Sequence, residues 1–546
     1  MSTTSSGVTV TAAGAAADAV TTHVPGLVDQ KFASRLFAQD KTLWGPDAES
    51  EAGKRLSWVG LPRTSRPLVG QINGLRAEFT AKGLGHVVLC GMGGSSLAPE
   101  VICETAGVPL TVLDSSQPDM VRASLGDRLE QTVVVVSSKS GSTVETDSQR
   151  RAYEAAFRAA GIDPAERIVV VTDPGSPLDA ESRKAGYHVV NADPDVGGRY
   201  SALTAFGLVP SGLAGADIEA LLDEAEAMAD VLASDDDSNP ALRLGAVLGG
   251  TQPLRDKVVL HDAGTSNVGF GDWVEQLIAE STGKLGKGLL PVVVGSTPVT
   301  RQTGDELLVE LRAVDDESAV DGAATVAVAG SLGAAMLLWE CAVSVAGRLI
   351  GINPFDQPDV ESAKQAARDL MGQGTGSSEP ASFTDGAVEV RTAGGDWLGS
   401  AKTVPQALQS LLDQLPDNGY LAIMAYLDRI ADRSLSDIRI AFASHLSRPV
   451  TFGWGPRFLH STGQYHKGGP ADGVYLQITI APHEDLAVPG RDFTFGEFIA
   501  AQSAGDAKVL ADHGRPVLRL HITDHQDGLA QVMQAVSALT GSGSTS

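Results

Sequence analysis

The stretch TVVVVSSKSGSTVET, residues 132–146, begins as a short apolar run of β-branched residues and continues through a polar loop into a segment with helical character. This order is typical of one strand-to-helix unit of a parallel sheet. Similar apolar runs surround it: HVVLC (86–90), PLTVLD (109–114) and RIVVVTD (167–173). Because strands that alternate with helices at this spacing are buried on both faces, the sequence predicts an α/β fold with a parallel sheet covered by helices.

The polar part of this stretch, SSKSGSTVET at 137–146, is called here the Ser/Thr loop. It offers the ammonium group of Lys139, free backbone N–H groups at a helix start and five hydroxyl groups, those of Ser137, Ser138, Ser140, Ser142 and Thr143. Of these, Ser138, Lys139, Ser140 and Thr143 are the candidate phosphate-binding residues. Donors on several sides and a favourable helix dipole suit a phosphate monoester. The pattern of a P-loop is absent. A capped helix start is the plainer interpretation, but the hydroxyls outnumber what capping requires, so we predict phosphate binding.

A second candidate is the glycine turn GMGGSS, residues 91–96, which follows the apolar run 86–90 and precedes a predicted helix. Glycines at such a turn allow a ligand to approach the backbone, and the helix N-terminus favours an anion. Alone, the pattern fits a structural turn better than a binding site. Gly94 and Ser95 are its candidate ligand-binding residues.

The rest of the chain predicts two further α/β regions. Candidate strands KVVLHD (257–262) and LPVVV (290–294) and candidate helices 272–281 and 331–350 form a second round like the first. Residues 372–386, rich in Gly, Ser and Pro, predict a linker or long loop. We therefore expect four regions: a tail and helical lead-in at 1–59, two sandwiches at 60–235 and 236–371, and a C-terminal α/β region at 387–546.

Within the lead-in, residues 1–25 are small and polar and are expected to be poorly ordered. The apolar stretch 331–352 contains Glu340 and Arg348, which are costly at the centre of a bilayer. A helix buried between protein layers is therefore expected there. The N-terminus has no basic region, so we do not interpret it as a secretory signal.

Charge and cysteine content restrict the possible partners. The formal net charge is −26, from 41 Lys+Arg against 67 Asp+Glu. Such an acidic surface repels nucleic acid and anionic membranes, and we expect neither as a partner. The three cysteines show no metal-binding spacing and are expected to be reduced and buried. No HxH, HExxH or paired-cysteine pattern occurs, so no metal site is expected.

Three further motifs carry a resemblance to a known family: DVGGRYSALTAFG (195–207), QLIAESTGK (276–284) and GRLIGINPFDQPDVESAK (347–364). With the two loops, they resemble the phosphoglucose isomerase family, which has the sugar isomerase (SIS) fold. The motifs occur in the family's order. Residues 453–477 instead resemble the C-terminal part of bifunctional transaldolase/phosphoglucose isomerase proteins, and nothing resembles the transaldolase half.

The resemblance implies reversible isomerisation of glucose 6-phosphate and fructose 6-phosphate through a cis-enediolate. It makes Glu280 the catalytic base, with Gln276 one turn earlier on the same helix face. Arg199 is positioned to stabilise the enediolate, and Lys364 to assist ring opening. The resemblance also implies a cytoplasmic homodimer that needs no cofactor. The alternative interpretations are a solvated surface charge for Glu280 and for Lys364, and a structural salt bridge for Arg199.

One family residue is missing from its usual place. The family's ring-opening histidine lies between the base and the lysine, but this sequence has no histidine between His261 and His445. His460 and His466, in HSTGQYHKGG, are the candidate substitutes, and His466 is slightly favoured because it follows Gly-Gln with one residue inserted. We therefore predict that residues 453–477 fold back onto the site of Arg199, Glu280 and Lys364.

Two alternatives remain open from the sequence. The first is a dual phosphoglucose/phosphomannose isomerase, because the motifs do not fix the configuration accepted at C2. The second is a sugar-phosphate-binding SIS protein that performs no catalysis. That protein would be expected to lack the base or the arginine, whereas Glu280 and Arg199 are both present.

Overall fold

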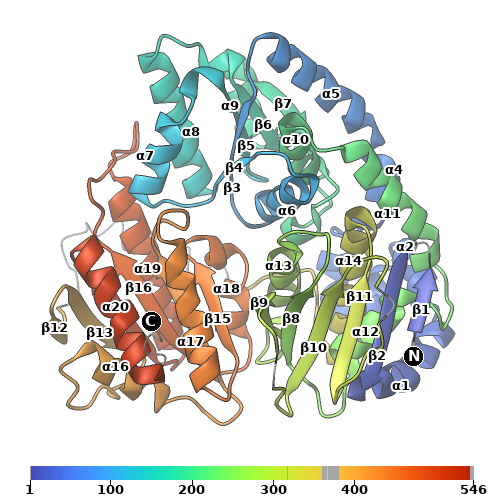
Figure 1. Ribbon diagram of the computed structural model, residues 1–546. Coiled ribbons are helices and arrows are strands. Elements are labelled where there is room, and N and C mark those ends of the chain that lie inside the picture. The colour runs from blue at the N-terminus through green and yellow to red at the C-terminus, as the bar shows by residue number, and fades with distance from the viewer. Residues whose placement is uncertain are drawn as a thin grey trace. The chain divides into compact units, whose positions relative to one another are not determined.

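A computed structural model of the protein describes residues 2–5, 7–299, 301–316, 318–359, 366 and 380–541. The chain divides into two compact units (Figure 1). Unit 1 comprises Met1–Asp114 and Asp127–Gln357, and unit 2 comprises Ser115–Gly126 and Pro358–Ser546. Both α/β rounds predicted before residue 371 build sheets of unit 1, and the predicted C-terminal α/β region builds the sheet of unit 2. The predicted α/β class with parallel strands is confirmed.

The first sheet of unit 1 has five parallel strands in the order β4-β3-β5-β6-β7. They are β3 (His86–Gly91), β4 (Thr111–Leu113), β5 (Thr132–Ser137), β6 (Ile168–Thr172) and β7 (His188–Asn191). Every residue of β5 and β6 is buried, as their valine runs predict for strands covered on both faces. Three helices pack on the sheet: α8 (Val144–Ala159), α9 (Pro177–Ala185) and α10 (Ala205–Ala214).

The second sheet of unit 1 is mixed, with the order β1-β2-β11-β10-β8-β9. Its four parallel strands are β8 (Lys257–Ala263), β9 (Leu290–Gly295), β10 (Glu306–Arg312) and β11 (Ala324–Ala329). Helix α13 (Phe270–Thr282) packs on β8 and β9. A layer of mutually packed helices also belongs to this half: α1 (Ala15–Asp29), α11 (Ile218–Leu232), α12 (Pro240–Gly250) and α14 (Leu332–Ile350).

The N-terminal segment is ordered over most of its length, in contrast to the expectation of a poorly ordered tail. Strand β2 (Val8–Gly14) pairs antiparallel with β11, and β1 (Ser2–Ser5) pairs antiparallel with β2. The side chains of β2 alternate between buried and partly exposed positions, with Val8, Val10 and Ala12 buried. This alternation anchors the segment, because a two-residue period places its apolar residues on the core face of the sheet.

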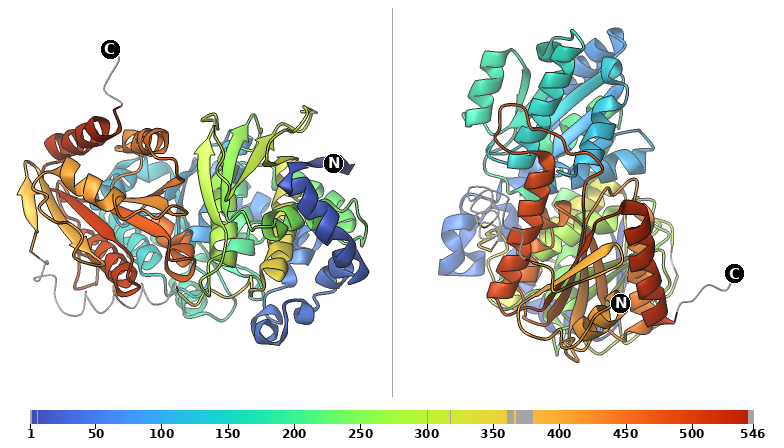
Figure 2. Two further views of the ribbon diagram at one scale, coloured as in Figure 1. Left: turned by 90° about the horizontal axis from the view of Figure 1, so that it is seen from below. Right: turned by 90° about the vertical axis from the view of Figure 1, so that its left-hand side faces the viewer.

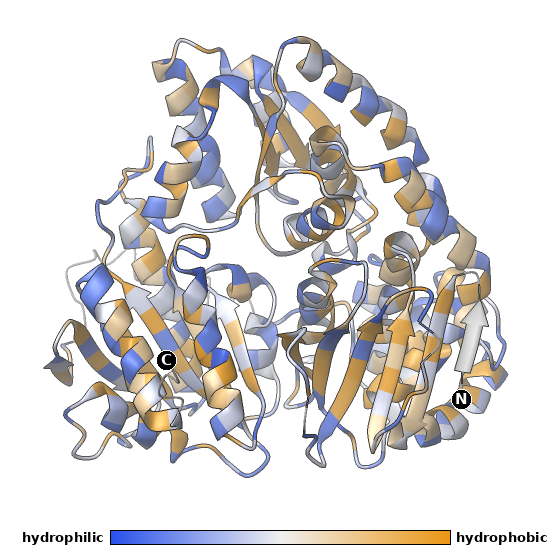
Figure 3. Cartoon of the chain, viewed as in Figure 1, coloured by the Kyte–Doolittle hydropathy of each residue, from blue (hydrophilic) through white to orange (hydrophobic). Residues whose placement is uncertain are grey.

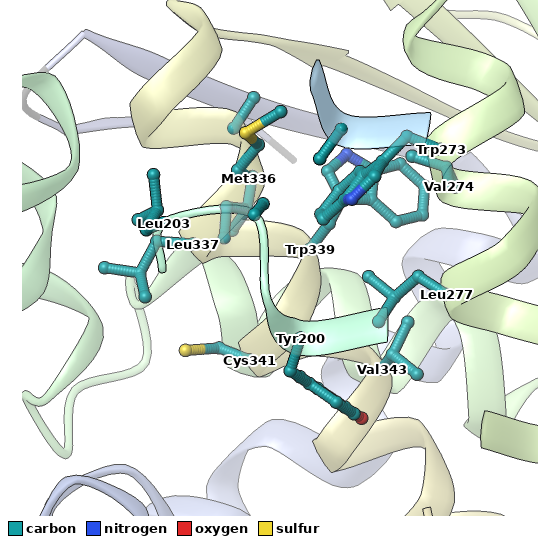
Figure 4. Close-up of a cluster of buried hydrophobic side chains, with 14 of the residues drawn as sticks. Tyr200, Leu203, Trp273, Val274, Leu277, Met336, Leu337, Trp339, Cys341 and Val343 are labelled. Atoms are coloured by element: carbon teal, nitrogen blue, oxygen red, sulfur yellow. The ribbon is translucent and has the colours of Figure 1, made fainter. Parts of the chain in front are cut away.

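Helix α14 is long and apolar enough to cross a membrane by length and composition alone. Every residue of Leu332–Gly347 is buried inside unit 1. Figure 4 shows Trp339 and Val343 of this helix beside Trp273 and Leu277 of α13, and Leu337 of the helix beside Leu203. Packing within the unit therefore accounts for its composition, as the sequence predicted.

Unit 2 holds a third sheet, in the order β12-β13-β17-β16-β14-β15. Its parallel strands are β14 (Tyr420–Tyr426), β15 (Val450–Trp454), β16 (Gly473–Ile480) and β17 (Val517–Ile522), and β12 (Phe383–Asp385) and β13 (Val388–Ala393) form its antiparallel edge. Figure 2 shows the sheet between α19 (Phe495–Asp512) on one face and α20 (His525–Thr540) on the other. Helices α16 (Val404–Leu412) and α17 (Ile438–His445) pack against α20.

Each unit has its own hydrophobic core, and the apolar residues follow the strands of all three sheets (Figure 3). One segment of unit 2, residues 115–126, stands in the sequence between the two parts of unit 1. Helix α7 (Pro118–Gly126) follows β4 but belongs to unit 2, where Arg122 donates to the backbone carbonyl of Glu484 at 2.8 Å and Ser116 donates to Gln502 at 2.5 Å. The predicted linker at 372–386 lies mostly outside the described residues.

Candidate active site

Helix α13 carries the residue predicted to be the base. Gln276 and Glu280 lie one turn apart, and Gln276 Nε2 donates to Glu280 Oε2 at 3.3 Å. Both side chains are buried, Glu280 with 6% of its surface exposed. Trp273 and Leu277 lie in the apolar cluster with α14 shown in Figure 4. Packing of these large residues fixes the rotation of α13 about its axis, and it therefore fixes the side of the helix on which the Glu280 carboxylate lies.

Arg199 lies next to that carboxylate. It belongs to the short 3-10 helix η7 (Gly198–Tyr200), and only 3% of its surface is exposed. One guanidinium nitrogen, Nη1, lies 3.8 Å from Glu280 Oε2, and Nε donates to the hydroxyl of Ser281 at 2.9 Å. That hydroxyl also lies 3.3 Å from the hydroxyl of Tyr200. The predicted base and the predicted enediolate-stabilising cation are therefore brought together within unit 1.

The segment of residues 353–357, called here the FDQ loop, completes the environment of Arg199. Nη2 donates to the backbone carbonyls of Pro354 at 2.7 Å and Asp356 at 2.9 Å, and Nη1 donates to Gln357 Oε1 at 3.1 Å. A guanidinium group can satisfy several acceptors at once because its donors lie in a fixed planar fork. The three sequence motifs at 195–207, 276–284 and 347–364 thus meet at one guanidinium group.

A second buried cation, Lys284, contacts the same loop. Its Nζ lies 2.8 Å from the carbonyl of Asn353, 2.6 Å from the carbonyl of Asp356 and 2.7 Å from Asp356 Oδ1. Burial and the neighbouring charge of Arg199 lower the pKa of Lys284 to about 8, although Asp356 and Glu280 oppose this shift. Lys284 belongs to the motif at 276–284, but the resemblance assigns it no role. A lysine that directly follows Gly283 at the end of an amphipathic helix is the one sequence feature that could suggest its burial.

The glycine turn lies directly against η7. A Cβ atom built on Gly94 would lie 1.9 Å from the carbonyl oxygen of Gly198, so no side chain fits at position 94. Strand β3 pairs with β5 so that Gly91 lies opposite Ser137, and the glycine turn and the Ser/Thr loop therefore leave the sheet side by side. Strand β3 pairs with β4 on one side and with β5 on the other, so the strand order changes direction at β3. Ligands of open α/β sheets bind at the carboxyl ends of strands at such a switch point.

In the Ser/Thr loop, Thr143 is the N-cap residue of α8, and among the described groups its side chain makes no capping hydrogen bond. The Ser138 hydroxyl donates to the Thr143 hydroxyl at 3.3 Å and accepts from the backbone N–H of Gly141 at 3.2 Å. The Ser140 hydroxyl lies 2.6 Å from that of Ser142. The hydroxyls thus gather at a helix N-terminus without serving as the cap.

Lys139 has a different environment from the one predicted. Its Nζ forms an ion pair with Asp173 Oδ2 at 2.9 Å and donates to the backbone carbonyl of Pro194 at 2.9 Å. The ammonium group therefore has an internal carboxylate partner, which reduces the positive charge that it can offer to a phosphate. The loop's remaining candidate groups for binding an anion are its hydroxyls and the backbone N–H groups of the helix start.

The two candidate histidines belong to unit 2. His466, in α18 (Gly463–Gly468), is buried, and its Nδ1 lies 3.0 Å from the hydroxyl of Tyr420, which lies 2.8 Å from the hydroxyl of Tyr475. Burial, with the nearby charges of Lys467 and Arg515, holds the pKa of His466 well below its usual range. His460 ends the 3-10 helix η9 (Arg457–His460) and is only partly buried.

Lys364, predicted to assist ring opening, lies outside the described residues. Within the described ranges, no group of three or more His, Cys, Asp or Glu side chains could hold a metal ion. The core of unit 1 also buries Glu340 of α14, a carboxyl group that the sequence motifs do not place in the site.

Comparison with known proteins identifies the family. A glucose-6-phosphate isomerase of Rippkaea orientalis is 38% identical over 220 residues, which cover 38% of this chain and 41% of that protein. A probable glucose-6-phosphate isomerase of Haloarcula marismortui is 36% identical over 226 residues, covering 39% of this chain and 50% of that protein. A third, a probable glucose-6-phosphate isomerase of Natronomonas pharaonis, is 31% identical over 341 residues, covering 53% of this chain and 79% of that protein.

The chain belongs to the glucose-6-phosphate isomerase family. The match spans 41% and 50% of the length of the first two relatives. No protein-family model matches the chain.

Two solved structures share the fold. A hypothetical protein from Thermus thermophilus superposes with a TM-score of 0.55 at 24% identity, covering 66% of this chain and 99% of that one. A glucose-6-phosphate isomerase from Chlamydia trachomatis superposes with a TM-score of 0.52 at 18% identity, covering 69% of this chain and 91% of that one. At these identities the likeness concerns the fold alone.

Proposed function

We propose that the chain is a glucose-6-phosphate isomerase, which interconverts glucose 6-phosphate and fructose 6-phosphate. The observation that carries the proposal is the buried pair of Glu280 and Arg199, whose nearest charged atoms lie 3.8 Å apart in a site built from three sequence motifs. Family membership supports the same reaction. A homodimer and a cytoplasmic location are further proposals, which rest on the resemblance of the motifs to the family.

The chemistry assigns a role to each group. Isomerisation moves a proton between C2 and C1 of the open-chain sugar, and a buried carboxylate such as Glu280 is a suitable base. The intermediate enediolate is negatively charged, and Arg199 is held ready to stabilise that charge without reorganisation. Gln276 fixes the carboxylate through its amide. The phosphate is proposed to bind at the Ser/Thr loop and the glycine turn, through Ser138, Ser140, Thr143 and Ser95.

Ring opening is proposed to involve Lys364 and one of the two histidines. A group that exchanges protons near neutral pH is needed, and the usual pKa of histidine suits that task. His466 is held neutral because burial lowers its pKa well below this range. The partly buried His460 is therefore the better candidate of the two, which reverses the slight preference drawn from the sequence.

The deciding experiment is a coupled assay of the purified chain with fructose 6-phosphate, comparing wild type, Glu280→Gln and Asp272→Asn. The glutamine keeps the shape of the base and removes its basicity, so turnover should fall by about 10²–10⁴-fold with little change in binding. Asp272 is an exposed carboxylate on the same helix, and its variant is the control that should keep normal turnover. Near-normal turnover of Glu280→Gln would overturn the assignment of the base.

The same assay separates the alternatives. Turnover of mannose 6-phosphate at a rate comparable to that of glucose 6-phosphate would indicate a dual isomerase. Binding of a sugar phosphate in calorimetry without turnover of any of the three would indicate a non-catalytic binding protein. The presence of both Glu280 and Arg199 at one buried site favours catalysis over binding alone.

A further inference from the structure

Lys284 is a buried cation that the proposed reaction does not use directly. It follows the C-terminal end of α13, and its side chain is 2% exposed. An ammonium group has three N–H donors and no acceptor. All three donors of Lys284 are matched by acceptors on the FDQ loop: the carbonyls of Asn353 and Asp356 and the carboxylate of Asp356. The side chain therefore joins the end of the helix that carries the base to the FDQ loop.

The same loop orients Arg199. The carbonyl of Asp356 accepts from both Lys284 Nζ, at 2.6 Å, and Arg199 Nη2, at 2.9 Å. Arg199 also donates to the carbonyl of Pro354 at 2.7 Å. If the loop shifted, the guanidinium group would lose the acceptors that set its plane, and its distance to Glu280 would no longer be fixed. An indirect path thus leads from the ammonium group of Lys284 through the loop to the catalytic pair.

We propose that Lys284 is a positioning residue that holds the FDQ loop in the conformation that orients Arg199 against Glu280, and that it does so only while its ammonium group is protonated. The inference rests on the proposed isomerase function. Lys284 is not placed against the substrate, because its three donors are directed to the loop. Its effect on catalysis is therefore exerted through Arg199.

Protonation matters because of the number of donors. A neutral amine has two N–H donors and a lone pair, and the lone pair would face a carbonyl or carboxylate oxygen of the loop. The charged groups that face Lys284 are Arg199 from η7, Glu280 from α13 and Asp356 from the loop. Burial and Arg199 lower the pKa of Lys284 to about 8. A change in the loop is therefore expected just above neutral pH rather than near pH 10.

The test compares Lys284→Met, Lys284→Arg and the control Lys287→Met, an exposed lysine three residues further along the same turn. For each protein, kcat and KM are measured from pH 6.5 to 9.5. Hydrogen exchange of the peptide covering residues 353–357 is followed over the same range, with correction for the intrinsic effect of pH. Circular dichroism and thermal melting establish that each variant is folded.

The wild type and Lys287→Met should lose activity above about pH 8, with faster exchange of the loop. Lys284→Met should lose at least about tenfold in kcat already at pH 7, because small displacements of catalytic groups are costly, and should show fast loop exchange at all pH values. Lys284→Arg, which stays charged, should retain more activity than the methionine variant and should lack the decline near pH 8.

The proposal is overturned if Lys284→Met keeps wild-type kcat and slow loop exchange, or if Lys284→Arg retains the decline near pH 8. If Lys284→Met does not fold, the arginine variant alone decides. An inactive wild type would contradict the proposed function, whereas the exchange data would still test the loop. Loop exchange that rises with pH in wild type but not in Lys284→Arg supports the positioning role, and identical exchange in both refutes it.

Discussion

At the scale of single residues, the site depends on cations bound to backbone carbonyls. Arg199 donates to two carbonyls of the FDQ loop and Lys284 to two, with that of Asp356 shared. Carbonyl dipoles compensate part of the cost of burying these charges without neutralising them. Arg199 is therefore held in place for its proposed role towards the enediolate, with Glu280 3.8 Å away. A lysine at position 199 could not reproduce the planar set of bonds.

The phosphate site can be tested at the same scale. A triple variant, with Ser138, Ser140 and Thr143 each changed to alanine, removes the hydroxyls that gather at the start of α8. Each hydrogen bond to a charged phosphate contributes about 1.5–3 kcal/mol, so KM for the sugar phosphate should rise at least about a hundredfold. The measurement is steady-state kinetics with fructose 6-phosphate at fixed pH.

Two single variants serve as controls for this prediction. Ser142→Ala removes an exposed hydroxyl of the same loop that is outside the predicted set. Lys139→Met removes a cation already paired with Asp173, and should affect KM much less than the triple variant. An unchanged KM in the triple variant would mean that the loop is only a structural helix start.

At the scale of elements, the long apolar helix α14 contains a buried carboxyl group. Glu340 is fully buried, and among the described residues neither of its oxygens has a hydrogen-bond partner. Burial raises its pKa well above 4.5, so the folded chain keeps the proton that the unfolded chain releases. Above about pH 4.5, this difference should lower stability by about 1.4 kcal/mol for each pH unit until the folded pKa is reached.

Glu340→Met, which replaces the carboxyl group by an apolar group of similar volume, should therefore raise the melting temperature by several degrees at pH 7.5 and change it little at pH 4.5. Differential scanning calorimetry of both proteins at the two pH values measures this. The difference should be large at the higher pH because the unfolded glutamate is fully ionised there and only half ionised at pH 4.5. A lower melting temperature of the variant at pH 7.5 would show that the carboxyl group has a stabilising partner.

The strands that the sequence predicts and those that it does not predict differ in their residue patterns. The valine runs of β5 and β6 are buried on both faces and were predicted without ambiguity. Strand β10 is not predicted because Glu310 interrupts its apolar run and Glu306 and Arg312 stand at its ends. Strand β2 was assigned to a tail because Val8 and Val10 alternate with threonines, although that alternation is typical of a half-buried strand.

The site shows a similar division. The roles of Glu280, Arg199 and Gln276 are predicted from the resemblance of their motifs to the family, because a buried carboxylate and a surface one look alike in a single sequence. The burial of Lys284 and the pairing of Lys139 with Asp173 depend on segments distant in sequence, which spacing alone does not reveal. The close approach of Gly94 to Gly198 is also a tertiary property, although the glycines themselves were noted.

At the scale of the whole molecule, the predicted catalytic groups are distributed over two units of one chain. The base and the arginine belong to unit 1, whereas His460 and His466 belong to unit 2. The two histidines differ in their surroundings. His466 is surrounded by tyrosines, with ring centroids 5.8 Å from Tyr420 and 5.4 Å from Tyr475, as expected of a core residue. His460 is partly buried at the end of a short helix.

These surroundings predict different consequences for His466→Ala and His460→Ala. Loss of the His466 ring leaves a cavity and removes one hydrogen-bond partner of the Tyr420 hydroxyl, so the first variant should be destabilised by about 2–4 kcal/mol. His466 has a pKa below its unfolded value of 6.5, so its contribution to stability is present above about pH 6.5 and is lost as pH falls toward the folded pKa. The destabilisation of the variant should therefore be largest at pH 7–8 and smaller near pH 5, in urea unfolding experiments at both pH values.

His460→Ala should leave stability nearly unchanged and should impair turnover of the cyclic sugar more than proton exchange at C2 of an open-chain analogue. If instead His466→Ala impairs turnover without loss of stability, the buried histidine is the catalytic one. If neither variant changes turnover, ring opening must depend on Lys364 and water, and unit 2 contributes no histidine to the reaction.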